Sequence, residues 1–244
     1  MFKRTIIIWA IANFAVVGLV SLMAGEWYIG WHVSSLTAMY VELGLIILPN
    51  LILSIAALRY GSFATQSNTK SELGWQWNGW QSILVGIVAF VFMYLAVRIV
   101  AGFLGESIPY NMPEVSGENN GIQINNASDL LKIAGILISL LIFVALTVIG
   151  EESMFRGLIQ TQIGKHYGAW IGVLIGAVLF GLRHLPNDIY YAQVWQATPG
   201  MWISRQVQLY LGAVILGLSR YFGKSTYSSA ITHGLYLCVA LFSL

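Results

Sequence analysis

Long apolar stretches, separated by short polar segments, run along the whole chain. A helix needs about 20 predominantly apolar residues to span the hydrocarbon core of a bilayer. Seven stretches approach this length: 5–24, 36–58, 81–104, 130–162, 167–184, 207–222 and 227–243. The pattern predicts an all-α, polytopic membrane bundle of seven transmembrane helices, and a partial helix over 189–206 would make an eighth.

Composition supports a membrane protein over a soluble one. The 244 residues are 57% hydrophobic and only 9% charged, whereas a soluble domain carries about 25% charged residues. No internal repeat or separate soluble segment is visible, so we expect one integral membrane domain over 1–244. The formal net charge of +2 comes without a clustered basic face, which argues against nucleic acid as a partner. The lipid bilayer is the expected surrounding.

Charged residues near the ends of the stretches indicate an orientation. The first stretch is longer than the roughly 7–15 apolar residues of a signal peptide, so an uncleaved helix is favoured. If the N-terminus is cytoplasmic, the following basic residues lie at or near the cytoplasmic face: Lys3, Arg4, Arg59, Lys70, Arg156, Lys165, Arg220 and Lys224. The opposite face then receives these acidic residues: Glu26, Glu106, Glu114, Glu118, Asp129 and Asp188. This agrees with the positive-inside rule.

Ionisable side chains inside apolar stretches are costly and therefore point to function. Glu151, Glu152 and Arg156 interrupt the fourth stretch. His184 ends the fifth, and His233 lies within the seventh. Two carboxylates and two imidazoles on three hydrophobic segments are the components of a buried acid–base site.

The fourth and fifth stretches are expected to form an antiparallel hairpin that turns near Gly164–Gly168. Glu151 lies about 13 residues before this turn and His184 about 17 residues after it, so both are roughly 20–25 Å from the turn at 1.5 Å per residue. They can therefore lie at similar depth. Phe180 and His184 are spaced i,i+4, which places an aromatic ring beneath the imidazole.

The two adjacent glutamates point about 100° apart on a helix and need not share one role. Glu152 and Arg156 are spaced i,i+4, which predicts an ion pair. That pair would leave Glu151 without a counter-ion of its own and free to act as a general base. Arg183, beside His184, is expected to extend its side chain toward the interface, and contact with a substrate carboxylate is the alternative.

These residues also carry a family resemblance. Glu151-Glu152-x-x-x-Arg156, Phe180-x-x-x-His184 about thirty residues later, and His233 on a further helix resemble the motifs of the CAAX-protease and bacteriocin-processing family. This is the Abi group of intramembrane glutamic endopeptidases, which includes the Ras-converting CAAX prenyl endopeptidase. The resemblance covers roughly residues 130–240, which would hold the catalytic core.

The resemblance implies an intramembrane endopeptidase that cleaves a membrane-associated peptide or lipidated protein. It implies that Glu151 and His184 activate a water molecule and that His233 stabilises the oxyanion. Glu152, Arg156 and Phe180 would organise the site. The family usually places Asn or Asp four residues after its last histidine, but this chain has Leu237 there. Loss of one oxyanion donor can lower a rate ~10²–10³-fold.

Other interpretations remain open from the residues alone. Glu151–Arg156 taken alone fits a charge cluster where a helix leaves the lipid, and either histidine alone fits a structural role. A non-catalytic immunity or scaffold protein that binds a peptide or bacteriocin is the main alternative to a peptidase. A transporter has little support, because neither inverted repeats nor a pair of broken helices is visible.

No cofactor is expected. Glu151, His184 and His233 could form a zinc set of hydrolytic type, but no His-Glu-x-x-His helix or thiolate cluster accompanies them. The resemblance also implies a metal-independent mechanism. The short chain, without long cytosolic loops, favours a prokaryotic cell membrane as its location.

Overall fold

The computed structural model describes residues 55, 73–105, 141–142, 144–194 and 197–242. All regular secondary structure in this part of the chain is helical and it contains no strand, in agreement with the all-α prediction. The predicted helices at 5–24 and 36–58, the acidic loop before residue 130 and the expected cytoplasmic N-terminus lie outside it.

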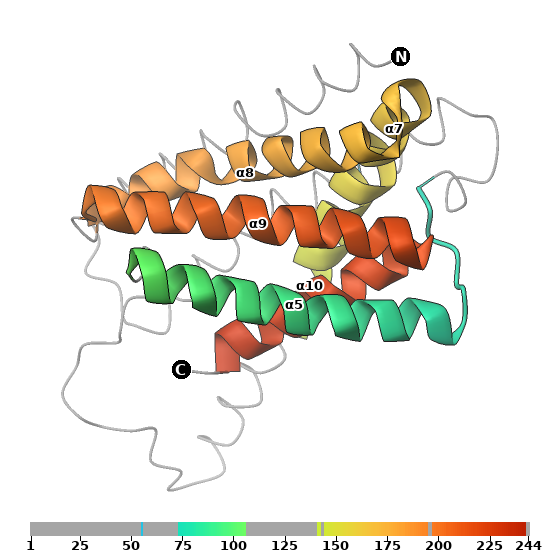
Figure 1. Ribbon diagram of the computed structural model, residues 1–244, viewed down its shortest axis with the longest axis horizontal. Helices are drawn as coiled ribbons and strands as arrows, with labels where there is room; N and C mark the ends of the chain where they lie inside the picture. Colours follow the sequence, from blue (N-terminus) through green and yellow to red (C-terminus); the bar gives the residue numbers. More distant parts are fainter. Residues whose placement is uncertain (1–54, 56–72, 106–140, 143, 195–196, 243–244) are drawn as a thin grey trace, which may run out of the picture.

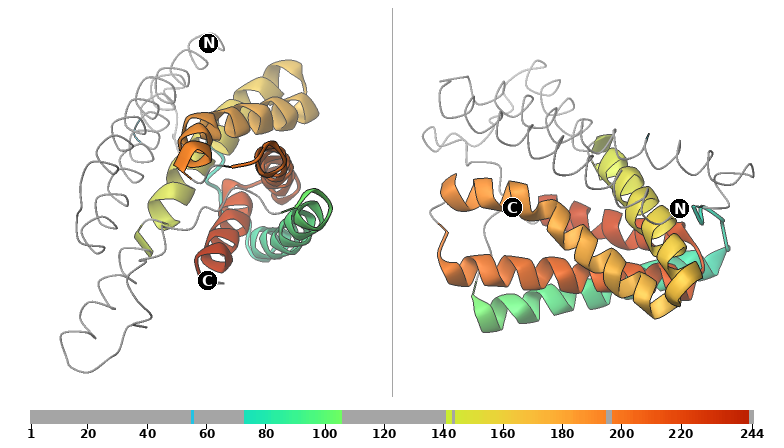
Figure 2. Two further views of the ribbon diagram at one scale, coloured as in Figure 1. Left: turned by 90° about the vertical axis from the view of Figure 1, so that its left-hand side faces the viewer. Right: turned by 90° about the horizontal axis from the view of Figure 1, so that it is seen from above.

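The helices have the following bounds: α5 is Trp80–Leu104, the π-helix η2 is Glu152–Gln160, α7 is Thr161–Tyr167, α8 is Ala169–Val194, α9 is Pro199–Gly223 and α10 is Thr226–Phe242. In Figure 1, α9 lies between α8 and α5, with the three helices running along the long axis. Helix α10 packs against both α5 and α9, while η2 and α7 cross the bundle obliquely (Figures 1 and 2).

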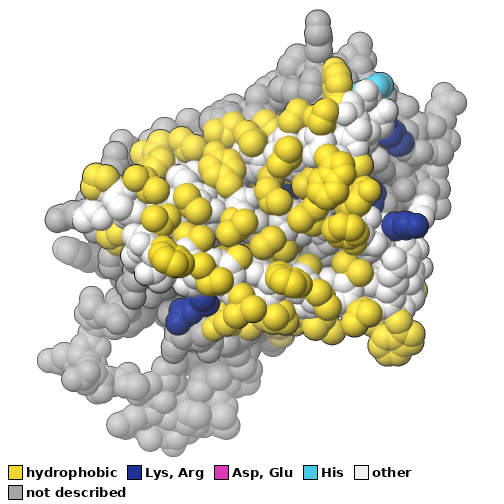
Figure 3. All heavy atoms as spheres, in the orientation of Figure 1, with side chains coloured by type: hydrophobic (Ala, Val, Ile, Leu, Met, Phe, Trp, Pro, Cys, Tyr) yellow, Lys and Arg dark blue, Asp and Glu magenta, His cyan; other side chains and the backbone are white. Residues whose placement is uncertain are grey.

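Helix α5 confirms the third predicted stretch. It is the one helix among the described residues that is long and apolar enough to cross a membrane, and Ala169–Leu185 is a shorter apolar segment. Large side chains are exposed at the two ends of α5, where Trp80 is 82% and Phe103 86% exposed. Figure 3 shows hydrophobic side chains over most of this face of the molecule. An apolar surface of this extent is suited to contact with lipid.

The boundary between the fifth and sixth predicted stretches differs from the prediction. Helix α8 continues through residues 189–194, and α9 already begins at Pro199, so 189–206 forms no helix of its own. Thr198 caps α9 by accepting a hydrogen bond from the Met201 amide at 3.3 Å, and Pro199 suits the first turn. The early turns of α9 contain polar residues, so a hydropathy pattern does not identify them as part of a transmembrane helix.

The predicted hairpin between the fourth and fifth stretches is confirmed. The chain turns at Gly168, whose φ of +97° strongly favours glycine. Gly172 then brings α8 against the π-helix, because a Cβ there would lie 2.6 Å from the Gln160 carbonyl oxygen. This close approach fixes the helix that carries Phe180 and His184 against the one that carries the glutamates.

Candidate active site

The helix of the fourth stretch changes its winding at the two glutamates. Residues 144–151 are α-helical, and Glu152–Gln160 form a π-helix in which every residue is buried. Such wide turns are rare and occur frequently at functional sites. The wider turn alters the direction in which the side chains after Glu151 project from the helix. No pattern of residues along the chain predicts it.

His233 from α10 lies between the two carboxylates. Its Nδ1 is 2.9 Å from Glu152 Oε1, and its Nε2 is 3.8 Å from Glu151 Oε2. The first contact is a hydrogen bond, and the second is longer than one. All three side chains are buried, with 5% or less of each exposed. A carboxylate can only accept, so the proton of this imidazole is placed on Nδ1.

Glu152 also confirms the predicted i,i+4 pair. Its Oε2 lies 3.6 Å from Arg156 Nε, and Arg156 donates from Nη2 to the Ala213 carbonyl oxygen at 3.3 Å. Arg156 is 1% exposed. Burial of both side chains inside the protein is inconsistent with a solvated charge cluster. The placement of Arg156 at or near the cytoplasmic face stays a prediction.

Glu151 is not free of a counter-ion, contrary to the prediction. Arg183 Nη1 lies 2.7 Å from Glu151 Oε1, and both side chains are buried. The expectation that Arg183 extends toward the interface is wrong for the same reason. Burial of an unpaired carboxylate is strongly unfavourable, which explains why a guanidinium from the neighbouring helix reaches it. Glu151 Oε2 is left facing His233.

His184 reaches this group through Arg183. Arg183 Nη1 is 3.4 Å from His184 Nε2, while His184 Nδ1 lies 2.9 Å from the Phe180 carbonyl oxygen. Because a carbonyl only accepts, Nδ1 carries the proton and Nε2 presents its lone pair. The contacts of Arg183 therefore connect Glu151 and His184, which the sequence predicted only to lie at similar depth.

Phe180 lies at the centre of these groups. Its ring centroid is 4.7 Å from the His184 ring and 6.1 Å from the His233 ring. The Arg156 guanidinium carbon is 4.6 Å from the same centroid, a cation–π distance. Phe155 packs edge-on against it at 5.2 Å. One aromatic ring thus lies beside two imidazoles and a guanidinium.

The structure therefore brings together all six residues predicted for the site, and it adds Arg183. The only sequence signal for Arg183 was its place in an apolar stretch next to His184. The charges of the two carboxylates and the two guanidiniums cancel. A second proton on His233, at Nε2, would therefore give the cluster one net positive charge. The cluster can move a proton between buried acid and base groups.

Metal binding is a separate question. Among the residues that the structure describes, no group of three or more His, Cys, Asp or Glu side chains is arranged to hold a metal ion. One oxygen of Glu151 is paired with Arg183, and one nitrogen of His233 is hydrogen-bonded to Glu152, so these two atoms are already engaged within the protein. The expectation of a mechanism without a cofactor stays a prediction, and a chelator tests it.

Comparison with known proteins gives a family match. The model of the family described as "Type II CAAX prenyl endopeptidase Rce1-like" matches residues 133–239. No curated protein and no solved structure matches the chain significantly. The matched segment includes η2 and helices α7 to α9, most of α10, and all seven residues of the buried cluster.

Proposed function

Because the model of the Rce1-like family of type II CAAX prenyl endopeptidases matches residues 133–239, we propose that this chain is an intramembrane endopeptidase of the glutamic type. It hydrolyses a peptide bond in a membrane-associated or lipidated peptide or protein. The observation that carries the proposal is the buried contact of His233 with Glu151 and Glu152.

Glu151 is the general base of the proposed reaction. Its Oε1 is held by Arg183, and its Oε2 lies 3.8 Å from His233 Nε2. A water molecule that makes ordinary hydrogen bonds to both of these atoms fits a separation of that size. Transfer of a water proton to Glu151 would generate the nucleophile that attacks the peptide carbonyl carbon.

His184 is the second group for proton transfer. Its Nδ1 proton is committed to the Phe180 carbonyl, so Nε2 is the atom that accepts. In the resting protein that atom faces Arg183. Movement of Arg183 on substrate binding would expose Nε2 to the water or to the leaving amine.

His233 stabilises the oxyanion. The Glu152 carboxylate, hydrogen-bonded to Nδ1, would compensate the charge of a protonated imidazole, which then has a second donor at Nε2. That donor can meet the negative charge that develops on the carbonyl oxygen. Glu152 and Arg156 act by positioning His233 rather than by touching the substrate. With Leu237 at the usual Asn or Asp position, His233 carries more of this stabilisation.

The proposed substrates follow from the family and the surroundings. A prenylated protein end is one class, and a leader peptide, peptide pheromone or bacteriocin precursor is the other. We propose a prokaryotic cell membrane, with the N-terminus in the cytoplasm. The apolar outer faces of α5 and α8 are suited to a substrate that arrives through the bilayer.

Cleavage by purified protein tests the proposal. The protein in nanodiscs is incubated with membrane-anchored and prenylated peptides, with and without a zinc chelator, and the products are identified by mass spectrometry. Wild-type cleavage that survives the chelator and is lost in Glu151→Gln and His184→Ala supports a glutamic peptidase. Failure of the wild type to cleave any peptide, while both variants keep the cellular function of the protein, would instead indicate a non-catalytic binder.

A further inference from the structure

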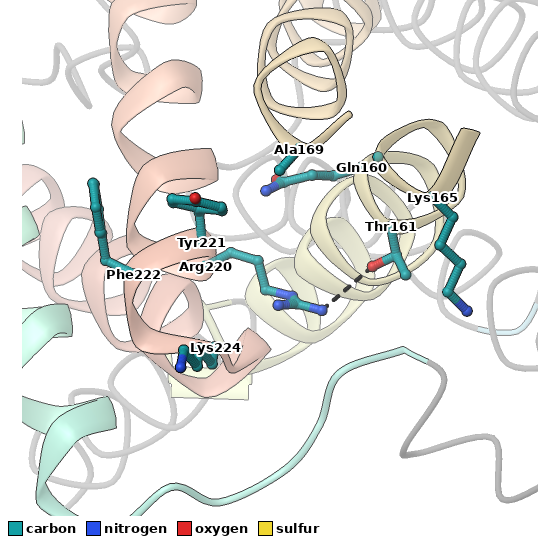
Figure 4. A pocket seen from close by; sticks show the side chains of 9 residues that line it. Gln160, Thr161, Lys165, Ala169, Arg220, Tyr221, Phe222 and Lys224 are labelled. Carbon is teal, nitrogen blue, oxygen red and sulfur yellow. Dashed lines mark hydrogen bonds between the residues drawn. The ribbon is translucent and has the colours of Figure 1, made fainter. Parts of the chain in front are cut away.

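A cavity of about 590 Å³ lies away from the glutamate cluster, where the α7–α8 turn meets the end of α9. Figure 4 shows its side chains, which come from the end of η2, from α7, from the start of α8 and from the end of α9. It is lined by Gln160, Thr161, Gly164, Lys165, Ala169, Arg220, Tyr221, Phe222 and Lys224.

Arg220 is the central charge of this cavity. Its guanidinium reaches from α9 toward Thr161 and donates from Nη2 to the threonine Oγ1 over a long 3.4 Å (Figure 4). Its Nε is buried and has no hydrogen-bond partner among the described residues, and no carboxylate of that part of the chain pairs with it. Burial of a cation is unfavourable unless it is paired, so an anionic ligand at this guanidinium would be stabilising.

The backbone is shaped around this guanidinium. Gly74 adopts φ of +70°, and a Cβ at that position would overlap with Arg220 Nη2. The segment before α5 therefore covers one side of the guanidinium, and Arg220 also lines the cavity. Arg220 is held in place rather than extended into solvent.

The rest of the lining carries the same sign of charge. Lys165 and Lys224 line the cavity with Arg220, and no lining residue is acidic. Helix α8, 26 residues long, begins at Ala169 on the cavity wall and adds the partial positive charge of its N-terminus. Cations and a helix start that face one cavity select an anion with several acceptor oxygens.

Two aromatic side chains line the cavity on the side of α9. Tyr221 lines it and stacks near Trp170, with ring centroids 5.5 Å apart, and Phe222 is 55% exposed beside them. Tyrosine and tryptophan gather where the hydrocarbon core meets the headgroups. In Figure 3 most of the Lys and Arg side chains lie at the end of the molecule that carries α7 and the end of α9, beside the hydrophobic face.

We propose that this cavity binds the phosphate of an anionic phospholipid headgroup. The cations would hold the phosphate oxygens, and the aromatic side chains would contact the glycerol and upper acyl region. Basic pockets between transmembrane helices on the cytoplasmic side bind such headgroups. This end is also the one that the positive-inside rule places in the cytoplasm. The proposal is independent of peptidase activity.

Native mass spectrometry of the detergent-solubilised protein tests the assignment. The probes are short-chain phosphatidylglycerol, the zwitterionic phosphatidylcholine and inorganic phosphate, each titrated separately. The variants are Arg220→Gln and Lys224→Asn, because asparagine tolerates the left-handed backbone at that position, with φ of +51°. Arg98→Gln on the exposed surface of α5 is the matched control for loss of one positive charge.

Phosphatidylglycerol should bind at least about tenfold more tightly than phosphatidylcholine. Affinity should fall about fivefold in Lys224→Asn and more than about tenfold in Arg220→Gln, with Arg98→Gln unchanged. If Arg220→Gln is not monodisperse, the lipid affinity of Lys224→Asn relative to wild type decides the test. Equal affinity in wild type and Lys224→Asn would overturn the proposal. Inorganic phosphate that binds as tightly as the lipid would also overturn it, because the cavity would then be a simple anion site.

Discussion

Arg183 forms a buried ion pair with Glu151, with 2.7 Å between Nη1 and Oε1. The same Nη1 lies 3.4 Å from His184 Nε2. One guanidinium nitrogen therefore contacts both residues proposed to activate water. The pair compensates the buried carboxylate, and it also restrains the two groups that the chemistry requires.

Replacement of Arg183 tests whether its geometry matters in addition to its charge. Arg183→Lys keeps a positive charge but loses the planar fork, and we expect cleavage to fall about 10²-fold with the fold retained. Arg183→Gln leaves an uncompensated buried carboxylate and should lower stability by about 3–5 kcal/mol. Thermal unfolding and initial cleavage rates separate the two effects. An Arg183→Lys enzyme as fast as wild type would show that Arg183 has no positioning role.

Glu152→Gln tests the proposed support of His233. The amide oxygen can still accept from Nδ1, but it carries no charge to compensate a protonated imidazole. We expect turnover to fall about 10²–10⁴-fold with little change in KM. The substitution also leaves Arg156 without its carboxylate, so stability should fall. The double variant Glu152→Gln with Arg156→Met removes that orphan charge and should regain stability but not activity. If activity returned as well, Glu152 would have only a structural role.

Phe180→Leu tests the shared aromatic contact. The substitution removes the ring beneath Arg156 and beside both imidazoles, and we expect a loss of about 1–3 kcal/mol in stability together with slower cleavage. Phe103→Leu, at a position 86% exposed on α5, is the matched control and should change neither quantity measurably. Equal effects of the two substitutions would contradict the central place given to Phe180.

Gly172→Ala tests the close approach of α8 to the π-helix. The added methyl would lie 2.6 Å from the Gln160 carbonyl oxygen, so we expect destabilisation by about 1–3 kcal/mol. At Gly102 on α5 an added Cβ meets nothing within 4 Å. Gly102→Ala should therefore raise stability slightly, by about 0.5–1 kcal/mol. The order of the two unfolding temperatures gives the answer, and a Gly172→Ala protein as stable as Gly102→Ala would be inconsistent with the packing.

The local spacings along the sequence were sufficient to predict part of the site. The i,i+4 pair of Glu152 and Arg156 and the stacking of Phe180 under His184 need only the helical repeat, and both are present. The turn at Gly168 also follows from the pattern. Helix α5 was predicted closely because a long apolar run has few alternatives.

The features of the site and the fold that could not be predicted from the sequence depend on contacts between helices. The pairing of Arg183 with Glu151 requires the relative rotation of two helices, which hydrophobic spacing does not determine. The π-helix has no residue pattern of its own. The early turns of α9 contain Ser204 and Gln208, which are buried and joined by a hydrogen bond of 3.1 Å, so hydropathy understated that helix.

The role of Glu151 as general base is tested most sharply by the single-turnover cleavage rate of Glu151→Gln in nanodiscs, with Asp188→Asn as control. Asp188 also has a buried carboxylate that is paired with an arginine, with 3.3 Å between its Oδ1 and Arg205 Nε. Each of the two variants therefore loses one buried ion pair. We expect Glu151→Gln to be slower than wild type by about 10²–10⁴-fold, as for loss of a general base, and Asp188→Asn to remain within a few-fold. A Glu151→Gln protein that cleaves as fast as Asp188→Asn would contradict the assignment of Glu151 as the base.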